Sequence, residues 1–236
     1  MKTYIVTYKE DETIEMYEYI LKKYWPSADM TVLGHVEPKY KSNFIKYESI
    51  GPDEGSSAVN RQLYDYFSKL NEPQFIFCVD DMPVLKSVDV ELINYTEELL
   101  QKNDTIGRVG LTTDNSTRPH TQISDITDKV SLIENASVAD YKLSATWSAW
   151  SRDYFLLYLN DYNNLWEWEI NGSAKSKGDD FEILGYIPPP MIHAHMVVRE
   201  KLKPNWYEGC INTEIGMSHI DMSRVDQQKM KDIYNI

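Results

Sequence analysis

Residues 73–85 read PQFIFCVDDMPVL, and this stretch decides the fold. Its apolar centre is rich in aromatic and β-branched residues, which favour a strand. The run ends directly in two acids, Asp80 and Asp81. The stretch therefore predicts a buried strand with a pair of carboxylates at its carboxyl end.

Strands and helices alternate in the first third of the chain. Short β-rich stretches at residues 3–8 and 30–34 predict strands, and apolar residues at helical spacing predict helices over about 14–24 and 57–70. This alternation is typical of an α/β fold with an open, mixed, mainly parallel sheet flanked by helices. In such sheets ligands bind beyond the carboxyl ends of the strands, which is where the acid pair lies.

Periodicity is weaker in the rest of the chain. A helix over about 88–102 precedes a strand candidate at 106–114. Further strands are predicted at 129–134, 141–150, 181–186 and 191–202, and a terminal helix at 225–234. Polar stretches separate these elements, which suggests a loop-rich second half built around a site.

Composition limits the classes of function. The chain has 236 residues, of which 42% are hydrophobic, enough for one well-filled core. A formal net charge of −13 and the lack of a Lys/Arg run argue against generic nucleic-acid binding. No signal-peptide pattern and no long apolar run are present, so we expect a cytoplasmic protein with no membrane partner. Two distant cysteines, Cys78 and Cys210, give no support to a disulfide framework or a zinc site.

Two adjacent acids at a strand end suit a divalent cation. Carboxylate oxygens bind Mg²⁺ or Mn²⁺, whose remaining ligands are usually water and substrate phosphates. A nucleotide-diphosphate donor fits this chemistry, with Asp81 as the direct metal ligand and Asp80 directed toward ribose or metal-bound water. An isolated pair of acids would more often begin a turn or cap a helix.

The sequence before the acid pair adds a second feature. GSSAVNRQLYDYFSKL, residues 55–70, precedes the strand directly. This arrangement resembles the GT-A glycosyltransferases, a Rossmann-related fold. The resemblance implies that Arg61 and Asn60 contact the nucleotide, and that Thr7 and Tyr8 line the base pocket. Taken alone, Arg61 is typical of a solvated helix residue.

This sequence departs from the Asp-x-Asp form of the resembled family. Val79 or Cys78 stands at the position of the first acid. The departure leaves the metal ligands open.

Residues 143–173, LSATWSAWSRDYFLLYLNDYNNLWEWEINGS, resemble a segment of small bacterial and viral glycosyltransferases. The matching positions are Trp150, Arg152, Asp153, Tyr154, Trp166, Glu167, Trp168, Glu169, Gly172 and Ser173. Thr146 replaces a Gln of the resembled segment. The resemblance implies one catalytic domain over residues 1–236, with a nucleotide-sugar-binding half (1–103) and an acceptor-side half (104–236).

Glycosyl transfer requires a carboxylate near the acceptor. An inverting enzyme needs a base to take the proton of the acceptor hydroxyl. Glu169 is the candidate base and Glu167 the reserve. Trp150, Trp166 and Trp168 are candidates for stacking on sugar faces. Alternatively, the Trp residues belong to the core and the Glu residues face water.

His193 and His195 lie two residues apart in a predicted strand, so they point to one face. Some metal-dependent members of the resembled fold supply a late His to the metal. His195 is the metal-ligand candidate and His193 its alternative. Either residue could instead be a core or edge histidine.

Three functions follow from these features. The first is metal-dependent transfer of a sugar from a nucleotide-diphosphate donor to an acceptor hydroxyl. The second is a nucleotidyltransferase that activates sugar phosphates, although residues 8–13, YKEDET, lack the glycine-rich basic loop of that class. The third is an inactive binding module of the same fold. The acceptor can be a glycan or a modified base in viral DNA flipped into a pocket.

Overall fold

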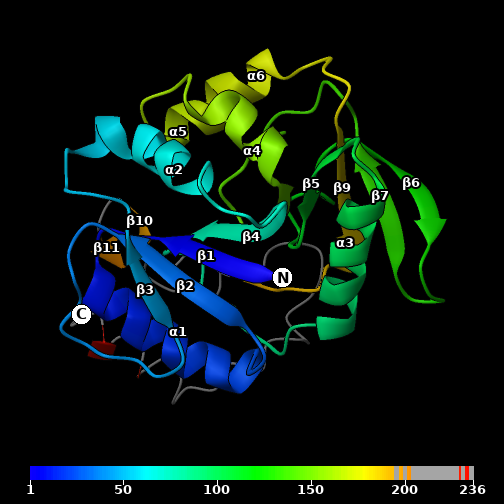
Figure 1. The fold of residues 1–236 in the computed structure, drawn as a ribbon. Coiled ribbons are helices and arrows are strands. Elements are labelled where there is room, and N and C mark those ends of the chain that lie inside the picture. Colours follow the sequence, from blue (N-terminus) through cyan, green and yellow to red (C-terminus); the bar gives the residue numbers. More distant parts are fainter. Residues whose placement is uncertain (194–196, 199–200, 203–228, 230–231, 234–236) are drawn as a thin grey trace.

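The computed structural model describes residues 1–193, 197–198, 201–202, 229 and 232–233. Nine of the described strands form one sheet (Figure 1) in the order β3-β2-β1-β4-β8-β5-β9-β7-β6. They are β1 (Lys2–Val6), β2 (Asp29–Gly34), β3 (Lys46–Ser49), β4 (Gln74–Val79), β5 (Ile106–Gly110), β6 (His120–Asp125), β7 (Ser131–Asn135), β8 (Ser148–Ser151) and β9 (Glu182–Ile187).

Seven of these strands run in one direction. β1 pairs in parallel with β2 and β4, β2 with β3, and β5 with β9. β8 is antiparallel to both β4 and β5, and β7 is antiparallel to β9 and β6. The predicted open, mixed, mainly parallel sheet with flanking helices is therefore confirmed.

Helices cover both faces of the sheet. α1 (Glu10–Tyr24) and α3 (Val90–Lys102) contribute to one apolar cluster. The other cluster contains residues of α2 (Val59–Phe67), α4 (Arg152–Leu159) and η2 (Trp168–Gly172), with the short α5 (Leu165–Glu167) and α6 (Ser173–Lys175) beside η2. Figure 1 shows α1 on one side of β1 and β4, and α2 and α4 on the other. The chain is thus a three-layer α/β/α unit.

Strand alternation explains why both layers are filled. In β1, Ile5 belongs to the cluster of α1 and α3, whereas Tyr4 belongs to the opposite cluster. In β4, Ile76 and Phe77 divide in the same way. Successive strand residues point to opposite faces, so an uninterrupted apolar strand feeds two cores.

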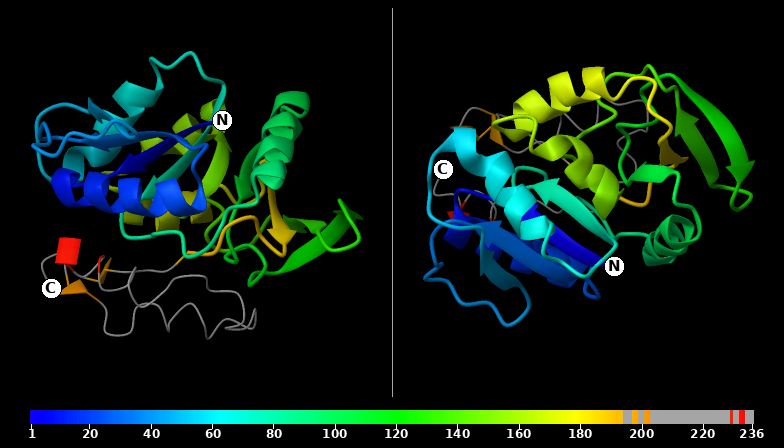
Figure 2. Two further views of the ribbon diagram at one scale, coloured as in Figure 1. Left: turned by 90° about the horizontal axis from the view of Figure 1, so that it is seen from below. Right: turned by 45° about the horizontal axis from the view of Figure 1, so that its top comes forward.

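The chain after β5 departs further from the predicted elements. Strand β8 occupies only the end of the predicted strand at 141–150, and residues 141–147 are irregular. Sequence reasoning missed β3, β6, α4 and the single π-helical turn η2. Figure 2 shows the β6–β7 hairpin projecting from the body of the molecule.

The predicted C-terminal elements lie mostly outside the described residues. β10 (Val197–Val198) pairs antiparallel with β11 (Lys201–Leu202), so the predicted strand at 191–202 is wrong as one continuous strand. Of the predicted helix at 225–234, only residues 229, 232 and 233 are described, and these are helical.

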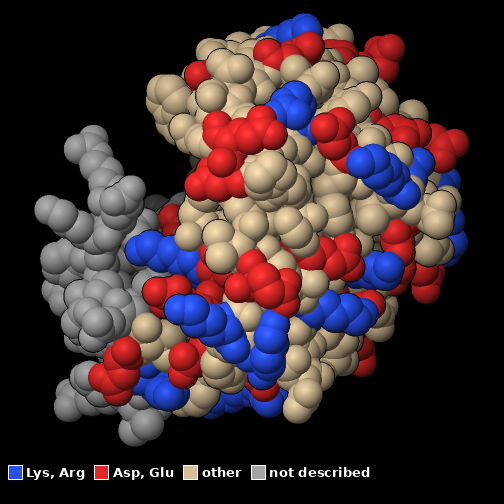
Figure 3. Space-filling model, turned by 60° about the vertical axis from the view of Figure 1, so that its left-hand side comes forward, with Lys and Arg blue, Asp and Glu red and all other residues tan. Residues whose placement is uncertain are grey.

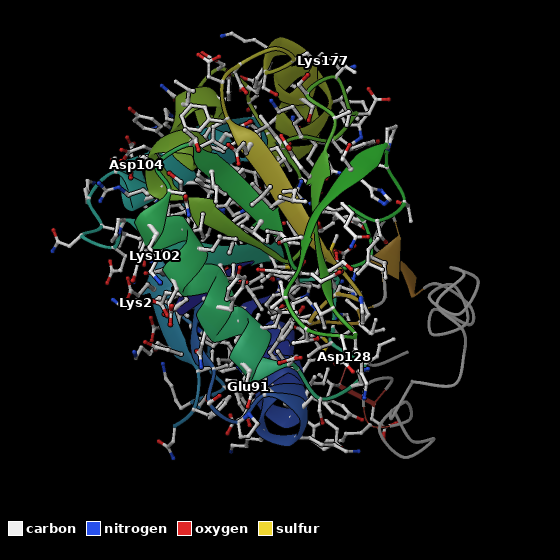
Figure 4. All side chains as sticks on the ribbon, turned by 90° about the vertical axis from the view of Figure 1, so that its right-hand side faces the viewer. Lys2, Glu91, Lys102, Asp104, Asp128 and Lys177 are labelled. Atoms are coloured by element: carbon white, nitrogen blue, oxygen red, sulfur yellow. The ribbon has the colours of Figure 1, made fainter. Side chains whose placement is uncertain are left out.

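The predicted helix over 88–102 is confirmed as α3, which begins two residues later, at Val90. The side chain of Asp89 caps it by accepting a hydrogen bond from the Leu92 N–H at 3.0 Å. Figure 4 shows α3 in front of the sheet, between the labelled Glu91 and Lys102.

The surface carries both signs of charge. On the face drawn in Figure 3, Lys and Arg side chains are interspersed with Asp and Glu and form no single basic patch. In the part of the chain that the structure describes, no helix combines the length and the apolar character needed to cross a membrane.

Candidate active site

The carboxyl ends of three parallel strands bring together residues from the start and middle of the chain. The register pairs Val6 with both Leu33 and Val79, so Thr7 lies between the ends of β2 and β4. Thr7 Oγ1 donates to Asp80 Oδ2 at 2.5 Å, and the Thr7 N–H donates to the Leu33 carbonyl at 2.9 Å. Thr7 therefore contacts Asp80 directly.

Asp80 is fixed by the first turn of α1 as well. Thr13 Oγ1 donates to the same oxygen, Asp80 Oδ2, at 3.3 Å. Burial raises the pKa of Asp80 to about 6, and the adjacent charge of Asp81 acts in the same direction, while the hydroxyls of Thr7 and Thr13 oppose the rise. Asp80 is thus ionised at neutral pH and close to its titration range.

A third carboxylate, Asp114, lies near the acid pair. Burial raises the pKa of the Cys78 thiol in β4, and the charges of Asp81, Asp80 and Asp114 all act in the same direction. Burial would also raise the pKa of Asp114, but His193 and Arg118 outweigh it and hold that pKa below its usual value. Asp114 is therefore a carboxylate at neutral pH.

The turn after β5 holds Asp114 in place. The next residue, Asn115, is buried and its amide donates to the Leu184 carbonyl of β9 at 2.5 Å. Gly110 makes room for this side chain, because a Cβ there would lie 2.6 Å from Asn115 Cγ. Sequence reasoning missed Asp114, although an acid directly after a predicted strand is the same signal that identified Asp80.

Glu169 lies in η2, which packs on the face of the sheet opposite α1. Glu169 Oε1 accepts a hydrogen bond from the Ala145 N–H at 2.6 Å. Burial raises the pKa of Glu169, and the Ala145 N–H, Ser144 and the charge of Arg108 moderate the rise. π-Helical turns are frequent at functional sites.

Ala145 connects Glu169 to the acid pair. While its N–H serves Glu169, its carbonyl accepts from the Val79 N–H at 3.1 Å, one residue before Asp80. A single residue thus joins η2 to the end of β4.

A buried arginine holds the segment before Ala145. Arg108 of β5 is fully buried, and its guanidinium donates to the carbonyls of Tyr141 (3.1 Å) and Lys142 (3.2 Å) and, through Nε, to Ser148 Oγ (2.8 Å). Burial lowers the pKa of Arg108 to about 9, so it stays charged at neutral pH. Lys142 is buried as well and pairs with Asp179 at 2.6 Å. We call residues 141–146 the strut.

The residues predicted to bind the nucleotide lie at two places, beyond the end of β1 and at the start of α2. Tyr8 is 51% exposed beyond the end of β1, with its ring 5.3 Å from that of His35. Asn60, at the start of α2, is fully buried, and its amide atoms have no hydrogen-bond partner among the described residues. Arg61 is exposed and pairs with Glu54 at 2.5 Å.

Two of the three predicted sugar-stacking residues are corrected. Trp150 and Trp168 are fully buried in the cluster of α2 and α4, with ring centroids 5.3 Å apart, so neither offers a face to a sugar. Trp166 is 71% exposed. Glu167 Oε2 accepts from the Asn163 N–H at 3.2 Å, a contact within its own turn.

The late histidines are partly described. His193 is buried, forms an isolated bridge with Val84, and interacts with Asp114. His195 lies outside the described residues.

The acid pair fits a divalent cation in its donor chemistry. Among the described residues no three His, Cys, Asp or Glu side chains group as a complete metal site. Mg²⁺ and Mn²⁺ need fewer protein ligands when phosphate and water complete the shell. Asp80 and Asp81 could supply that smaller share.

No protein-family model matches the sequence, and no curated protein matches it. The chain is similar in fold to solved structures of low identity. S. aureus TarS in complex with UDP-GlcNAc matches 100% of this chain and 72% of that chain, at 12% identity and a TM-score of 0.49. A197 from STIV matches 84% of this chain and 87% of its own chain, at 10% identity and a TM-score of 0.40. CMP:2-keto-3-deoxy-manno-octonic acid synthetase complexed with CTP matches 78% of this chain and 88% of its own chain, at 9% identity and a TM-score of 0.40.

Proposed function

We propose that this chain is a metal-dependent glycosyltransferase that moves a sugar from a nucleoside-diphosphate donor to an acceptor hydroxyl with inversion. The observation that carries the proposal is the position of Ala145. Its two backbone groups link the Glu169 carboxylate to the strand that ends in the acid pair. A base for the acceptor and a site for the leaving diphosphate are thereby held on one rigid segment.

The donor half is assigned to residues 1–103. Thr7, Tyr8 and His35 at the ends of β1 and β2 would contact the nucleoside, with Asn60 and Arg61 approaching from α2. Asp81 and Asp80 would hold Mn²⁺ or Mg²⁺, and His195, or His193, would be a further ligand. The bound ion would neutralise charge on the leaving diphosphate.

Glu169 is assigned as the general base. Its Oε1 is engaged by Ala145, which fixes the carboxylate and directs the proton transfer to Oε2. The acceptor oxygen forms a bond to the anomeric carbon, the bond to the diphosphate breaks, and Oε2 takes the hydroxyl proton. The raised pKa of Glu169 suits this role, because a stronger base accepts a proton more readily near neutral pH.

Asp114 and Arg118 are assigned to the transferred sugar. The Arg118 guanidinium lies 4.0 Å from the Asp114 carboxylate, and the charge of Asp114 raises the pKa of both Cys78 in β4 and Glu169. A carboxylate and a guanidinium at this position can accept from and donate to sugar hydroxyls. Both residues belong to the acceptor-side half, residues 104–236.

Turnover of donors tests the proposal. The protein is incubated with Mn²⁺ and UDP-, GDP- or dTDP-sugars, and released nucleoside diphosphate is measured with and without a panel of hydroxyl acceptors. Release that requires Mn²⁺ supports the proposal. Release of pyrophosphate from a nucleoside triphosphate and a sugar phosphate would replace it with nucleotidyl transfer. Inactivity in both assays would indicate a binding module.

A further inference from the structure

Tyr141 has an unusual backbone conformation. Among the described residues it is the one non-glycine residue with a positive φ, at 56°. The left-handed region is sterically unfavourable for a residue with a side chain, and bulky residues adopt it rarely. Such strain persists only where the surroundings hold it, and it is concentrated at functional sites.

Two guanidinium groups hold Tyr141. Its carbonyl accepts from Arg108 Nη1 at 3.1 Å and from Arg118 Nη1 at 2.6 Å. The next residue, Lys142, is buried and donates to the Ser176 carbonyl at 3.0 Å. Three cations therefore fix the first two residues of the strut.

The strained backbone presents an aromatic ring outward. Tyr141 is 41% exposed, whereas the strut residues 142–146 are buried. The Arg118 guanidinium lies 5.3 Å from the ring centroid and supports the ring. A fixed, supported and accessible ring has the properties of a stacking surface.

Tyr141 belongs to the same structural unit as the proposed base. The strut runs from Tyr141 to Ala145, which hydrogen-bonds Glu169. Both arginines that hold the Tyr141 carbonyl also interact with the charge of Glu169. The ring and the carboxylate are thus anchored to one rigid support.

We propose that Tyr141 is the stacking platform of the acceptor subsite and that it binds a pyranose ring whose hydroxyl reaches Glu169. The inference rests on the proposed glycosyl transfer. It assigns to an exposed residue the role that Trp150 and Trp168 are too buried to perform. A pyranose fits better than a nucleic-acid base, because the net charge of −13 repels a polyanion and a neutral sugar needs no basic surface.

The test uses saturation-transfer NMR with methyl glycosides of glucose, galactose, mannose and N-acetylglucosamine, and with thymidine as the competing class. Tyr141→Gly removes the ring and accepts the positive φ, so the thermal midpoint should not fall. Tyr141→Phe keeps the ring, and Tyr95→Ala on α3 is a matched removal of another partly exposed tyrosine.

At least one glycoside should bind the unmodified protein, and Tyr141→Gly should weaken that binding on the order of tenfold. Tyr141→Phe and Tyr95→Ala should bind within about twofold of the unmodified protein. Equal binding by Tyr141→Gly, no glycoside binding by the unmodified protein, or a preference for thymidine that Tyr141→Gly abolishes would overturn the inference. Parallel titration with UDP, GDP and dTDP separates the outcomes, since loss of nucleotide binding alone would contradict the donor site and leave the platform in place.

Discussion

The backbone N–H of Ala145 donates to Glu169 Oε1 at 2.6 Å, while the Ala145 carbonyl accepts from the β4 residue that precedes Asp80. Glu169 and the strand that carries the acid pair are therefore joined through the backbone groups of one residue.

Replacing the proposed base should separate binding from chemistry. Glu169→Gln keeps an oxygen that can accept from Ala145 but cannot take a proton. We expect donor affinity within about twofold of the unmodified protein and a loss of transfer of about 10²–10⁴-fold. Glu167→Gln is the matched control and should retain most of the activity, since Glu167 contacts its own turn. Unchanged transfer by Glu169→Gln would refute the base assignment.

The rate of transfer should rise with pH. The base acts when it is deprotonated, and burial places the pKa of Glu169 above its ordinary value of 4.5. Below its pKa the carboxyl is protonated and inactive, so kcat at saturating donor should increase as pH rises through that pKa. Measurements upward from pH 4.5, the ordinary pKa of this carboxyl, should show this limb, and Glu169→Gln should remove it. A limb of equal size in Glu169→Gln would assign it to another group.

The Asp80 carboxylate should lower the free energy of unfolding at neutral pH. Its pKa rises from 3.8 to about 6 on folding, so the stability gained by protonating it is fully present below the unfolded value and is lost as pH rises through about 6. In metal-free protein, Asp80→Asn should raise the free energy of unfolding at pH 7 by about 1–3 kcal/mol. Denaturant unfolding in chelator, compared at pH 7 and near pH 4, checks this. A variant that is less stable than the parent at pH 7 would show that the carboxylate is stabilised by its hydrogen bonds.

The Thr7 hydroxyl should be needed for full metal-dependent donor affinity, because it holds Asp80. Thr7→Val keeps the shape of the side chain but removes the hydroxyl that donates to Asp80 at 2.5 Å and accepts from the Lys9 N–H at 2.8 Å. Loss of a hydrogen bond to a charged group costs about 1.5–3 kcal/mol, so metal-dependent donor affinity should fall by roughly 10-fold or more. Thr7→Ser retains the hydroxyl and should bind donor almost normally. Equal affinities for the Val and Ser variants would exclude this role.

Sequence patterns predicted the sheet and the position of the acid pair at the end of β4. The apolar strand that ends in Asp80 and the alternation of elements around it were sufficient, because parallel strands bring their carboxyl ends to one edge. Thr7, which the resemblance assigned to the base pocket, lies beside Asp80.

Patterns could not predict the contacts that hold Glu169 and the strut. Local spacing does not show that the Arg108 side chain is fully buried. The π-helical turn that carries Glu169 has no sequence signal in a stretch of alternating Trp and Glu. Trp168 of η2 faces the core and Trp166 of the preceding α5 faces solvent, since a helix rotates side chains by about 100° per residue. The strut depends on contacts between residues far apart in the chain, such as Arg108 with Tyr141.

Calorimetric titration with UDP, GDP and dTDP, first with Mn²⁺ and then with chelator, tests the central claim most directly. The unmodified protein should bind one of these nucleotides in the presence of Mn²⁺ and lose that binding when the ion is removed. Asp81→Asn should bind none in either condition. Absence of binding by the unmodified protein, or the same affinity with chelator present, would contradict a metal-diphosphate site at the end of β4.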